Sequence, residues 1–224
     1  FNLNSLVIAE EGGRASINPV GMVHFARLLD AAEIGAEHAG LSAALIDWLD
    51  SDSQPMPGGA EDGYGASDNY RAANTLLADM GELRNVRGFT PEIIRRIAPY
   101  ACVRPTTAPN QINPNTLRPE QAALLTLAAD DLTLDQASAI IRDRPRGGWA
   151  TVDDFLLHPT MSALSLNETA RAQFSMVTRY YILAARVERT DAIETSVVLL
   201  EQDQNGRAAV LRRLFGVGRA ETLL

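Results

Sequence analysis

The segment YYILAARVERTDAIETSVVLLEQDQNGRAAVLRRLF, residues 180–215, decides the fold class of this chain. Tyr180–Glu188 and Thr195–Leu200 are rich in β-branched, aromatic and aliphatic side chains, which favour strands. Asp203–Gly206 ends on Asn-Gly, a pair that accepts the positive φ angles of tight hairpin turns. With Ala208–Phe215 as a third strand, the segment predicts an antiparallel meander.

The residues before this meander predict helices. Between Asn18 and Gly35 the apolar side chains recur at helical spacing, and Pro19 lies in the first turn, where proline is tolerated. Further helices are predicted over Ala39–Trp48 and Asn69–Met80, from Thr90-Pro91-Glu92, near Pro119, after Thr133 and over Thr151–Leu156.

The first eight residues, FNLNSLVI, alternate loosely between large apolar and small polar side chains, which predicts a strand. An unpaired strand would leave an exposed edge, so we expect it to join the three C-terminal strands. The sequence therefore predicts an α+β fold. Residues 1–12 and 173–224 form a small antiparallel sheet, and residues 13–172 form an inserted all-helical domain.

Composition excludes several kinds of chemistry. The net charge is −8 and the chain of 224 residues contains no lysine, so a Schiff-base lysine and a P-loop lysine are excluded. No Gly-x-Ser-x-Gly or His-Glu-x-x-His motif occurs. We therefore expect a protein that is not an enzyme. Because the chain opens at Phe1 and not at a methionine, we expect that an N-terminal segment was removed.

The acidic loop over residues 47–68 is the candidate metal site. Asp50, Asp52 and Glu61 stand at positions 1, 3 and 12 of a twelve-residue window, the spacing of an EF-hand calcium loop. Pro55 takes the sixth position, where that loop turns on glycine, so the pattern predicts an irregular calcium site. The alternative is a solvated acidic loop that caps a helix. The full set of candidate ligands is Asp50, Asp52, Glu61, Asp62 and Asp68.

Residues Asn113–Leu156 have the plan of a helix-hairpin-helix module. Such modules grip DNA phosphates through backbone amides of a glycine-rich hairpin. Here the hairpin carries Asp130 and Asp131, whose negative charge opposes phosphate binding. We expect a structural role for this module and keep a nucleic-acid-binding module as the alternative function. A calcium-dependent hydrolase is a third hypothesis, for which the sequence offers carboxylates without an assembled nucleophile and base.

Several spaced motifs occur in order along the chain: Asp47–Asp52, Gly59–Asp62, Tyr70-Arg71-x-x-Asn74, Glu82–Gly88 and Ile112–Thr116. Together they resemble the minor pseudopilin K family of the bacterial type II secretion system. The opening Phe1–Asn4 is similar to the strand that follows the N-terminal helix of this family.

The resemblance implies a pilin-like sheet interrupted by a large helical domain. It also implies a hydrophobic N-terminal helix, missing from this chain, that anchors a periplasmic protein in the inner membrane. The implied place is the tip of the pseudopilus, with minor pseudopilins I and J as partners and contact with secreted proteins during export across the outer membrane. Members of the family can bind calcium, and the matching motif carries ligand roles onto Asp52, Glu61 and Asp62. The ligand roles of Asp50 and Asp68 are predicted from their spacing in the sequence alone.

Overall fold

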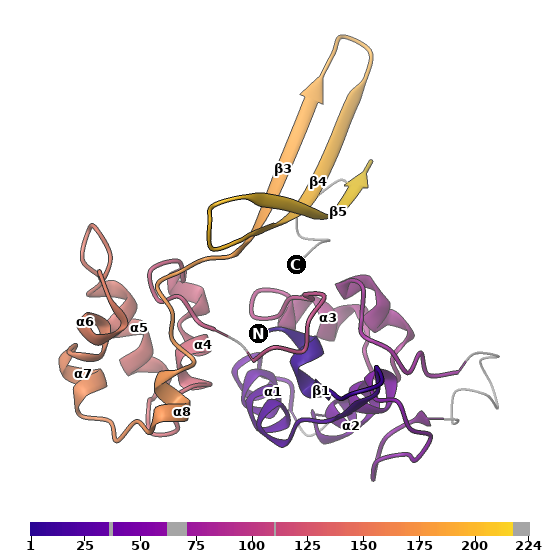
Figure 1. The fold of residues 1–224 in the computed structure, drawn as a ribbon, viewed down its shortest axis with the longest axis horizontal. Coiled ribbons are helices and arrows are strands. Elements are labelled where there is room, and N and C mark those ends of the chain that lie inside the picture. The colour runs from indigo at the N-terminus through magenta and orange to yellow at the C-terminus, as the bar shows by residue number, and fades with distance from the viewer. Residues whose placement is uncertain (36–37, 62–70, 110, 217–224) are drawn as a thin grey trace. The chain divides into compact units, whose positions relative to one another are not determined.

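The computed structural model describes residues 1–35, 38–61, 71–109 and 111–216 (Figure 1). The chain divides into two compact units, Phe1–Met176, here the helical unit, and Val177–Leu224, here the sheet unit. Helices and a small antiparallel sheet therefore occur together, which confirms the predicted α+β class.

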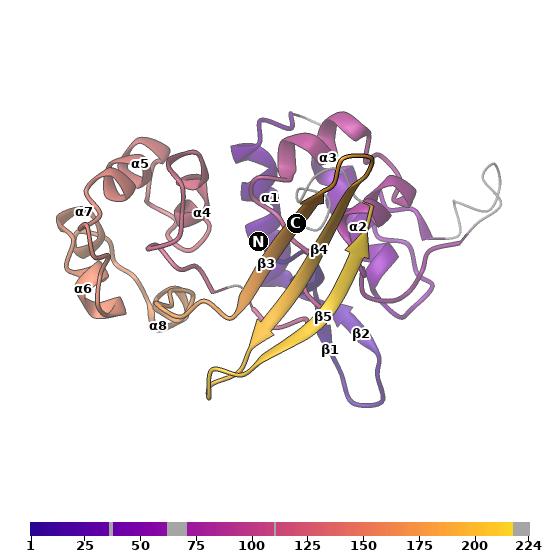
Figure 2. The ribbon, with the colours of Figure 1, turned by 90° about the horizontal axis from the view of Figure 1, so that it is seen from above.

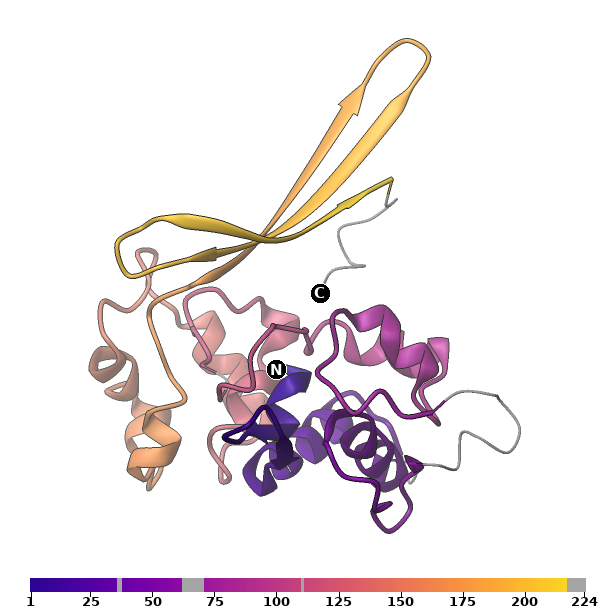
Figure 3. The ribbon, with the colours of Figure 1, turned by 45° about the vertical axis from the view of Figure 1, so that its right-hand side comes forward.

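The sheet unit contains three antiparallel strands, β3 (Tyr180–Glu188), β4 (Ile193–Gln202) and β5 (Ala208–Phe215). Figure 2 shows them side by side in chain order, and Figure 3 shows the same strands from another side, in orange to yellow. In the turn between β4 and β5 only Gly206 takes a positive φ, of 79°. The meander predicted from the sequence is thus confirmed, with a turn that depends on its glycine and not on the asparagine before it.

The prediction for the start of the chain is wrong. Leu3–Leu6 form a short 3-10 helix, η1, and only Val7–Ala9 form a strand, β1. After a reversal at Gly12-Gly13, with φ of 85° and 78°, β1 pairs antiparallel with β2 (Ala15–Ile17). This two-stranded sheet is separate from the sheet of β3, β4 and β5, so residues 1–12 belong to the helical unit.

The surroundings of η1 explain why these residues do not form the predicted strand. The core of the helical unit encloses η1. Leu3 and Leu6 are fully buried there. The Asn4 side-chain amide donates to the carbonyl oxygens of Leu77 at 2.9 Å and Arg104 at 2.8 Å, and its Oδ1 accepts from the Leu77 N–H at 2.9 Å. These distant partners satisfy the buried amide. The local alternation of apolar and polar residues in the sequence does not reveal these distant partners.

The first two helices, α1 (Pro19–Ala31) and α2 (His38–Leu49), confirm the prediction and lie against each other and against η1. Phe25, Leu28 and Leu29 bury the inner face of α1. Every described side chain of α2 from Leu41 to Leu49 is buried. Among the residues that the structure describes, no helix combines the length and the apolar character needed to cross a membrane.

The helix predicted over Asn69–Met80 is wrong in its described part, because residues 71–79 contain no helix. Asn74 takes a positive φ of 47°, which interrupts helical geometry, and its side chain donates to the carbonyl oxygen of Asp52 at 2.9 Å. A 3-10 helix, η3 (Met80–Asn85), begins only after Asp79, whose side chain accepts a hydrogen bond from the N–H of Gly81 at 2.6 Å.

The remaining helices are short, and those predicted from Thr90, near Pro119, after Thr133 and from Thr151 begin where the sequence predicts, whereas α7 and α8 were not predicted. Thr90 caps α3, and Thr133 and Thr151 each form a capping box with the residue three positions later. The helix-hairpin-helix assignment of Asn113–Leu156 stays a prediction. The bounds are α3 Pro91–Ile97, η4 Pro119–Gln121, α4 Ala123–Thr126, α5 Leu134–Arg142, α6 Val152–Leu156, α7 Pro159–Ser162 and α8 Glu168–Arg171.

Candidate metal site

Three carboxylates from the end of α2 and the following loop come together in the helical unit. Asp50, Asp52 and Glu61 each offer one oxygen, and these oxygens lie within 4.8 Å of one another. The other two candidates, Asp62 and Asp68, lie outside the described residues. The structure therefore groups all three of the sequence-predicted ligands that it describes.

Asp50 is the most unusual of the three. Its N–H donates to the carbonyl oxygen of Ile46 at 2.8 Å, so it closes the last turn of α2, and it is only 2% exposed. Its Oδ1 has no hydrogen-bond partner within the described chain. Burial raises the pKa of Asp50 to about 6, and the carboxylates of Asp52 and Asp47 add to the rise. A buried carboxylate oxygen without a partner is unfavourable, and a bound cation would compensate it.

Asp52 and Glu61 reach the same place from the two ends of the loop. Asp52 is exposed, and its Oδ1 accepts from the N–H of Gln54 at 2.7 Å, which turns the chain sharply after α2. The start of the loop is also tied to β2, because the Ala15 N–H donates to Ser51 Oγ at 2.8 Å. Glu61 is 2% exposed, so its carboxylate is delivered to the interior side of the group.

Asp47 is the residue at this site to which sequence reasoning assigned no role. It is fully buried, and its Oδ1 accepts from the N–H of Met56 at 3.0 Å. Its Oδ2 accepts from the N–H groups of Ala60 at 2.6 Å and Glu61 at 3.3 Å. Its signal in the sequence was that it is the only acidic residue within the apolar helix His38–Leu49.

The three grouped side chains fit a hard cation. They offer only carboxylate oxygens, which calcium prefers, and no sulfur or imidazole, which zinc sites use. Calcium takes about six to eight oxygen ligands, so three carboxylates would supply part of the shell, with backbone carbonyls and water for the rest. The buried Oδ1 of Asp50 supports this fit, because it has no hydrogen-bond donor among the described residues and a bound cation would compensate it.

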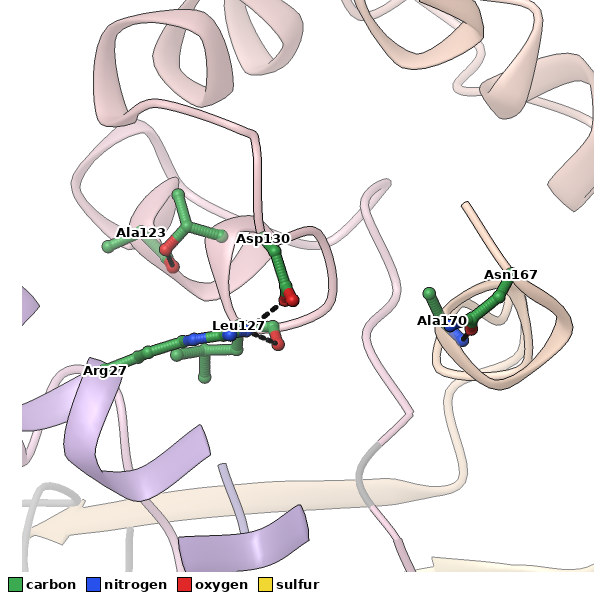
Figure 4. A network of polar contacts seen from close by, with 7 residues as sticks. Arg27, Ala123, Leu127, Asp130, Asn167 and Ala170 are labelled. Carbon is green, nitrogen blue, oxygen red and sulfur yellow. Dashed lines mark hydrogen bonds and ion pairs between the residues drawn. The ribbon is translucent and has the colours of Figure 1, made fainter. Parts of the chain in front are cut away.

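The hairpin of the predicted helix-hairpin-helix module contacts α1 within the helical unit. Asp130 Oδ1 lies 2.6 Å from Nη1 of Arg27 in α1, and the same nitrogen donates to the carbonyl oxygen of Leu127 at 3.3 Å (Figure 4). In the same view Asn167 accepts from the N–H of Ala170 at 2.8 Å and caps α8. The negative charge at this hairpin therefore serves an internal ion pair and would repel a phosphate group.

Comparison with known proteins points to one family. Two family models described as "Type II secretion system (T2SS), protein K" match residues 1–106 and 112–176. The chain is 34% identical over 225 residues to type II secretion system protein K of Klebsiella pneumoniae, with 97% of this chain and 67% of that protein covered. It is 42% identical over 125 residues to the protein of the same name from Dickeya chrysanthemi, with 55% and 34% covered. The chain thus spans about one third to two thirds of the length of these relatives.

A solved structure shares the fold. A chain in the crystal structure of a GspK–GspI–GspJ complex from the type 2 secretion system of enterotoxigenic Escherichia coli superposes with a TM-score of 0.80 at 27% identity. The match covers 97% of this chain and 76% of that chain. These matches give no support to the nucleic-acid-binding alternative.

Proposed function

Because this chain belongs to the type II secretion system protein K family, we propose that it is a minor pseudopilin that caps the tip of the secretion pseudopilus. In this role it helps to assemble the pseudopilus for the export of folded proteins across the outer membrane. The observation that carries the proposal is the likeness of nearly the whole chain to a chain of the GspK–GspI–GspJ complex. Its partners are then minor pseudopilins I and J, and it acts by protein contact without catalysing a reaction.

The proposed location is the periplasm, with the full-length protein anchored in the inner membrane by an N-terminal helix. Support comes from Phe1–Asn4, which resembles the segment that follows this helix in the family. The same proposal includes a pilin-like architecture for the full-length protein and contact with secreted proteins.

The size of the helical unit supports a place at the end of the fibre. A fibre built from head-to-tail contacts grows until a subunit cannot accept the next one. The helical unit, Phe1–Met176, far exceeds the sheet unit in length. A folded mass of this size on the terminal subunit would obstruct the stacking of another subunit above it.

Complex formation is tested by mixing the chain with the soluble domains of pseudopilins I and J and measuring the mass of the eluted species by light scattering. We expect one species with the summed mass of the three proteins, and mixtures with I alone and J alone as controls locate the contact. Three separately eluting proteins would contradict the proposal.

The tip position needs a second measurement. Leu157 is 74% exposed and suits a Leu157→Cys label in a Cys102→Ser background, with the Cys102→Ser protein as the unlabelled control. Gold particles on labelled pseudopili should appear at one end only. Particles spaced along the fibres would rule out a cap.

We further propose that Asp50, Asp52 and Glu61 bind a calcium ion, with Asp62 and Asp68 as additional candidate ligands. The ion would join the end of α2 to the far end of its loop and so stabilise the helical unit. The grouping of the three carboxylates and the unpartnered buried oxygen of Asp50 support this proposal.

A further inference from the structure

The loop Met56–Glu61 is held on two sides by residues outside the proposed ligand set. Asp47, from α2, accepts hydrogen bonds from the backbone N–H groups of Met56, Ala60 and Glu61. Arg87 donates from Nη2 to the carbonyl oxygen of Gly58 at 3.0 Å and to that of Gly59. The buried carboxylate of Asp47 and the exposed guanidinium of Arg87 thus hold the backbone that positions Glu61.

Gly59 shows how closely the loop approaches Asp47. A Cβ atom at this position would overlap Asp47 Oδ2, and the φ of Gly59 lies outside the left-handed region. Glycine is therefore needed here for space and not for backbone conformation. The contact offers a way to disturb Asp47 without removing its charge.

Both oxygens of Asp47 accept hydrogen bonds from backbone N–H groups, which distinguishes it from Asp50, Asp52 and Glu61, whose grouped oxygens lie within 4.8 Å of one another. We propose that Asp47 is a positioning residue for the calcium ion. It fixes the backbone at Ala60 and Glu61 so that the Glu61 carboxylate lies beside those of Asp50 and Asp52. The inference rests on the calcium binding proposed above.

Residues that orient metal ligands typically contribute about 10- to 100-fold to metal affinity. We therefore expect Asp47→Ala and Gly59→Ala each to weaken calcium binding by about this factor, measured by calorimetric titration of the full chain well below its melting temperature. Gly59→Ala is the decisive variant, because it leaves every charge in place. Loss of affinity in Asp47→Ala alone would reflect only the loss of a nearby negative charge, and would overturn the inference.

The effects of the two substitutions on calcium affinity should also not be additive. Asp47→Ala removes the three atoms that lie nearest to the methyl group of Gly59→Ala, so the double variant should bind calcium about as weakly as Asp47→Ala. Full additivity would show that the two residues act separately.

Matched controls exist elsewhere in the chain. A Cβ at Gly147 meets nothing within 4 Å, so Gly147→Ala should bind calcium as the unchanged protein does. Asp203 also accepts backbone N–H groups, from Asn205 and Arg207 at 2.8 Å each, but in the sheet unit, so Asp203→Ala controls for loss of such a carboxylate.

Hydrogen exchange in calcium-free protein provides a readout without the ion. The amides of Met56, Ala60 and Glu61 should exchange slowly in the unchanged protein and quickly in Asp47→Ala. If the unchanged protein binds no calcium, the proposed calcium site fails and this inference fails with it. If the unchanged protein binds calcium and Gly59→Ala binds it equally well, only the positioning role of Asp47 is overturned.

Discussion

Arg27 and Asp130 form an ion pair, with 2.6 Å between Nη1 and Oδ1, that joins α1 to the hairpin after α4. One partner lies in the region matched by the first family model and the other in the region matched by the second. The side chain of Asp130 is 77% exposed and that of Arg27 is 31% exposed, so water and salt screen the attraction. The pair therefore contributes little to the free energy of unfolding. Its main effect is to specify that α1 meets the hairpin after α4.

A double-mutant cycle with Arg27→Gln and Asp130→Asn should give a coupling free energy of about 0.2–1 kcal/mol, the usual value for exposed pairs. The coupling should shrink as the salt concentration rises. Urea denaturation of the four proteins measures it. Asp131→Asn, which removes the same charge from the adjacent residue, is the control, and coupling of Arg27 to Asp131 of equal size would contradict the assignment.

His24 should make stability depend on pH. Burial lowers the pKa of His24 below 6.5, the charge of Arg27 lowers it further, and Asp130 acts in the opposite direction. The unfolded chain therefore takes up this proton first, so the contribution of His24 is complete above pH 6.5 and is lost as the pH falls toward the lowered value. The free energy of unfolding should fall less between about pH 8 and about pH 5 in His24→Gln than in the unchanged protein.

The effect of Asp130 on the pKa of His24 gives a second prediction. Asp130→Asn removes a charge that favours protonated His24, so it should steepen the loss of stability toward low pH, whereas Asp131→Asn should steepen it less. Equal slopes in the unchanged protein and in His24→Gln would contradict this role of His24.

Asn115 ties together residues that are 34 positions apart. Its Oδ1 accepts from the N–H of Trp149 and its Nδ2 donates to the carbonyl oxygen of Trp149, both at 2.9 Å. Asn115→Ala leaves both backbone groups of a largely buried residue without this partner, so we expect a loss of about 1–3 kcal/mol in the free energy of unfolding. Asn167→Ala, which removes one exposed cap, is the matched control. A loss in Asn115→Ala no larger than in this control would contradict the structural role of Asn115.

Calcium should stabilise the protein, by about 2.7 kcal/mol at a hundredfold excess over its dissociation constant. Melting in calcium and in a chelator measures the effect. Asp50→Asn should abolish the calcium response yet leave the calcium-free protein at least as stable, because it removes a buried carboxylate whose Oδ1 has no hydrogen-bond partner among the described residues and whose pKa burial raises. Asp203→Asn should keep the full response. Identical melting curves with and without calcium in the unchanged protein would exclude a bound ion.

The sequence by itself determined the features that neighbouring residues control. Strands β3 and β5 have the predicted bounds, and Thr90, Thr133 and Thr151 cap helices where the sequence places them. A cap and a hairpin turn depend on side chains within about four positions of each other, so their physics is readable along the chain. The spacing of Asp50, Asp52 and Glu61 spans a longer stretch, but it follows a known calcium-loop pattern, and the structure brings these three residues together.

Only the tertiary structure decided what distant contacts control. Asn4 turns a predicted strand into a buried 3-10 helix through Leu77 and Arg104, which are 73 and 100 positions away. The partner of β1, the loop-holding role of Asp47 and the pairing of Arg27 with Asp130 likewise depend on which segments meet in space. Burial and hydrogen-bond satisfaction are properties of the packed core, and a buried polar group selects its conformation only when its partners are in place.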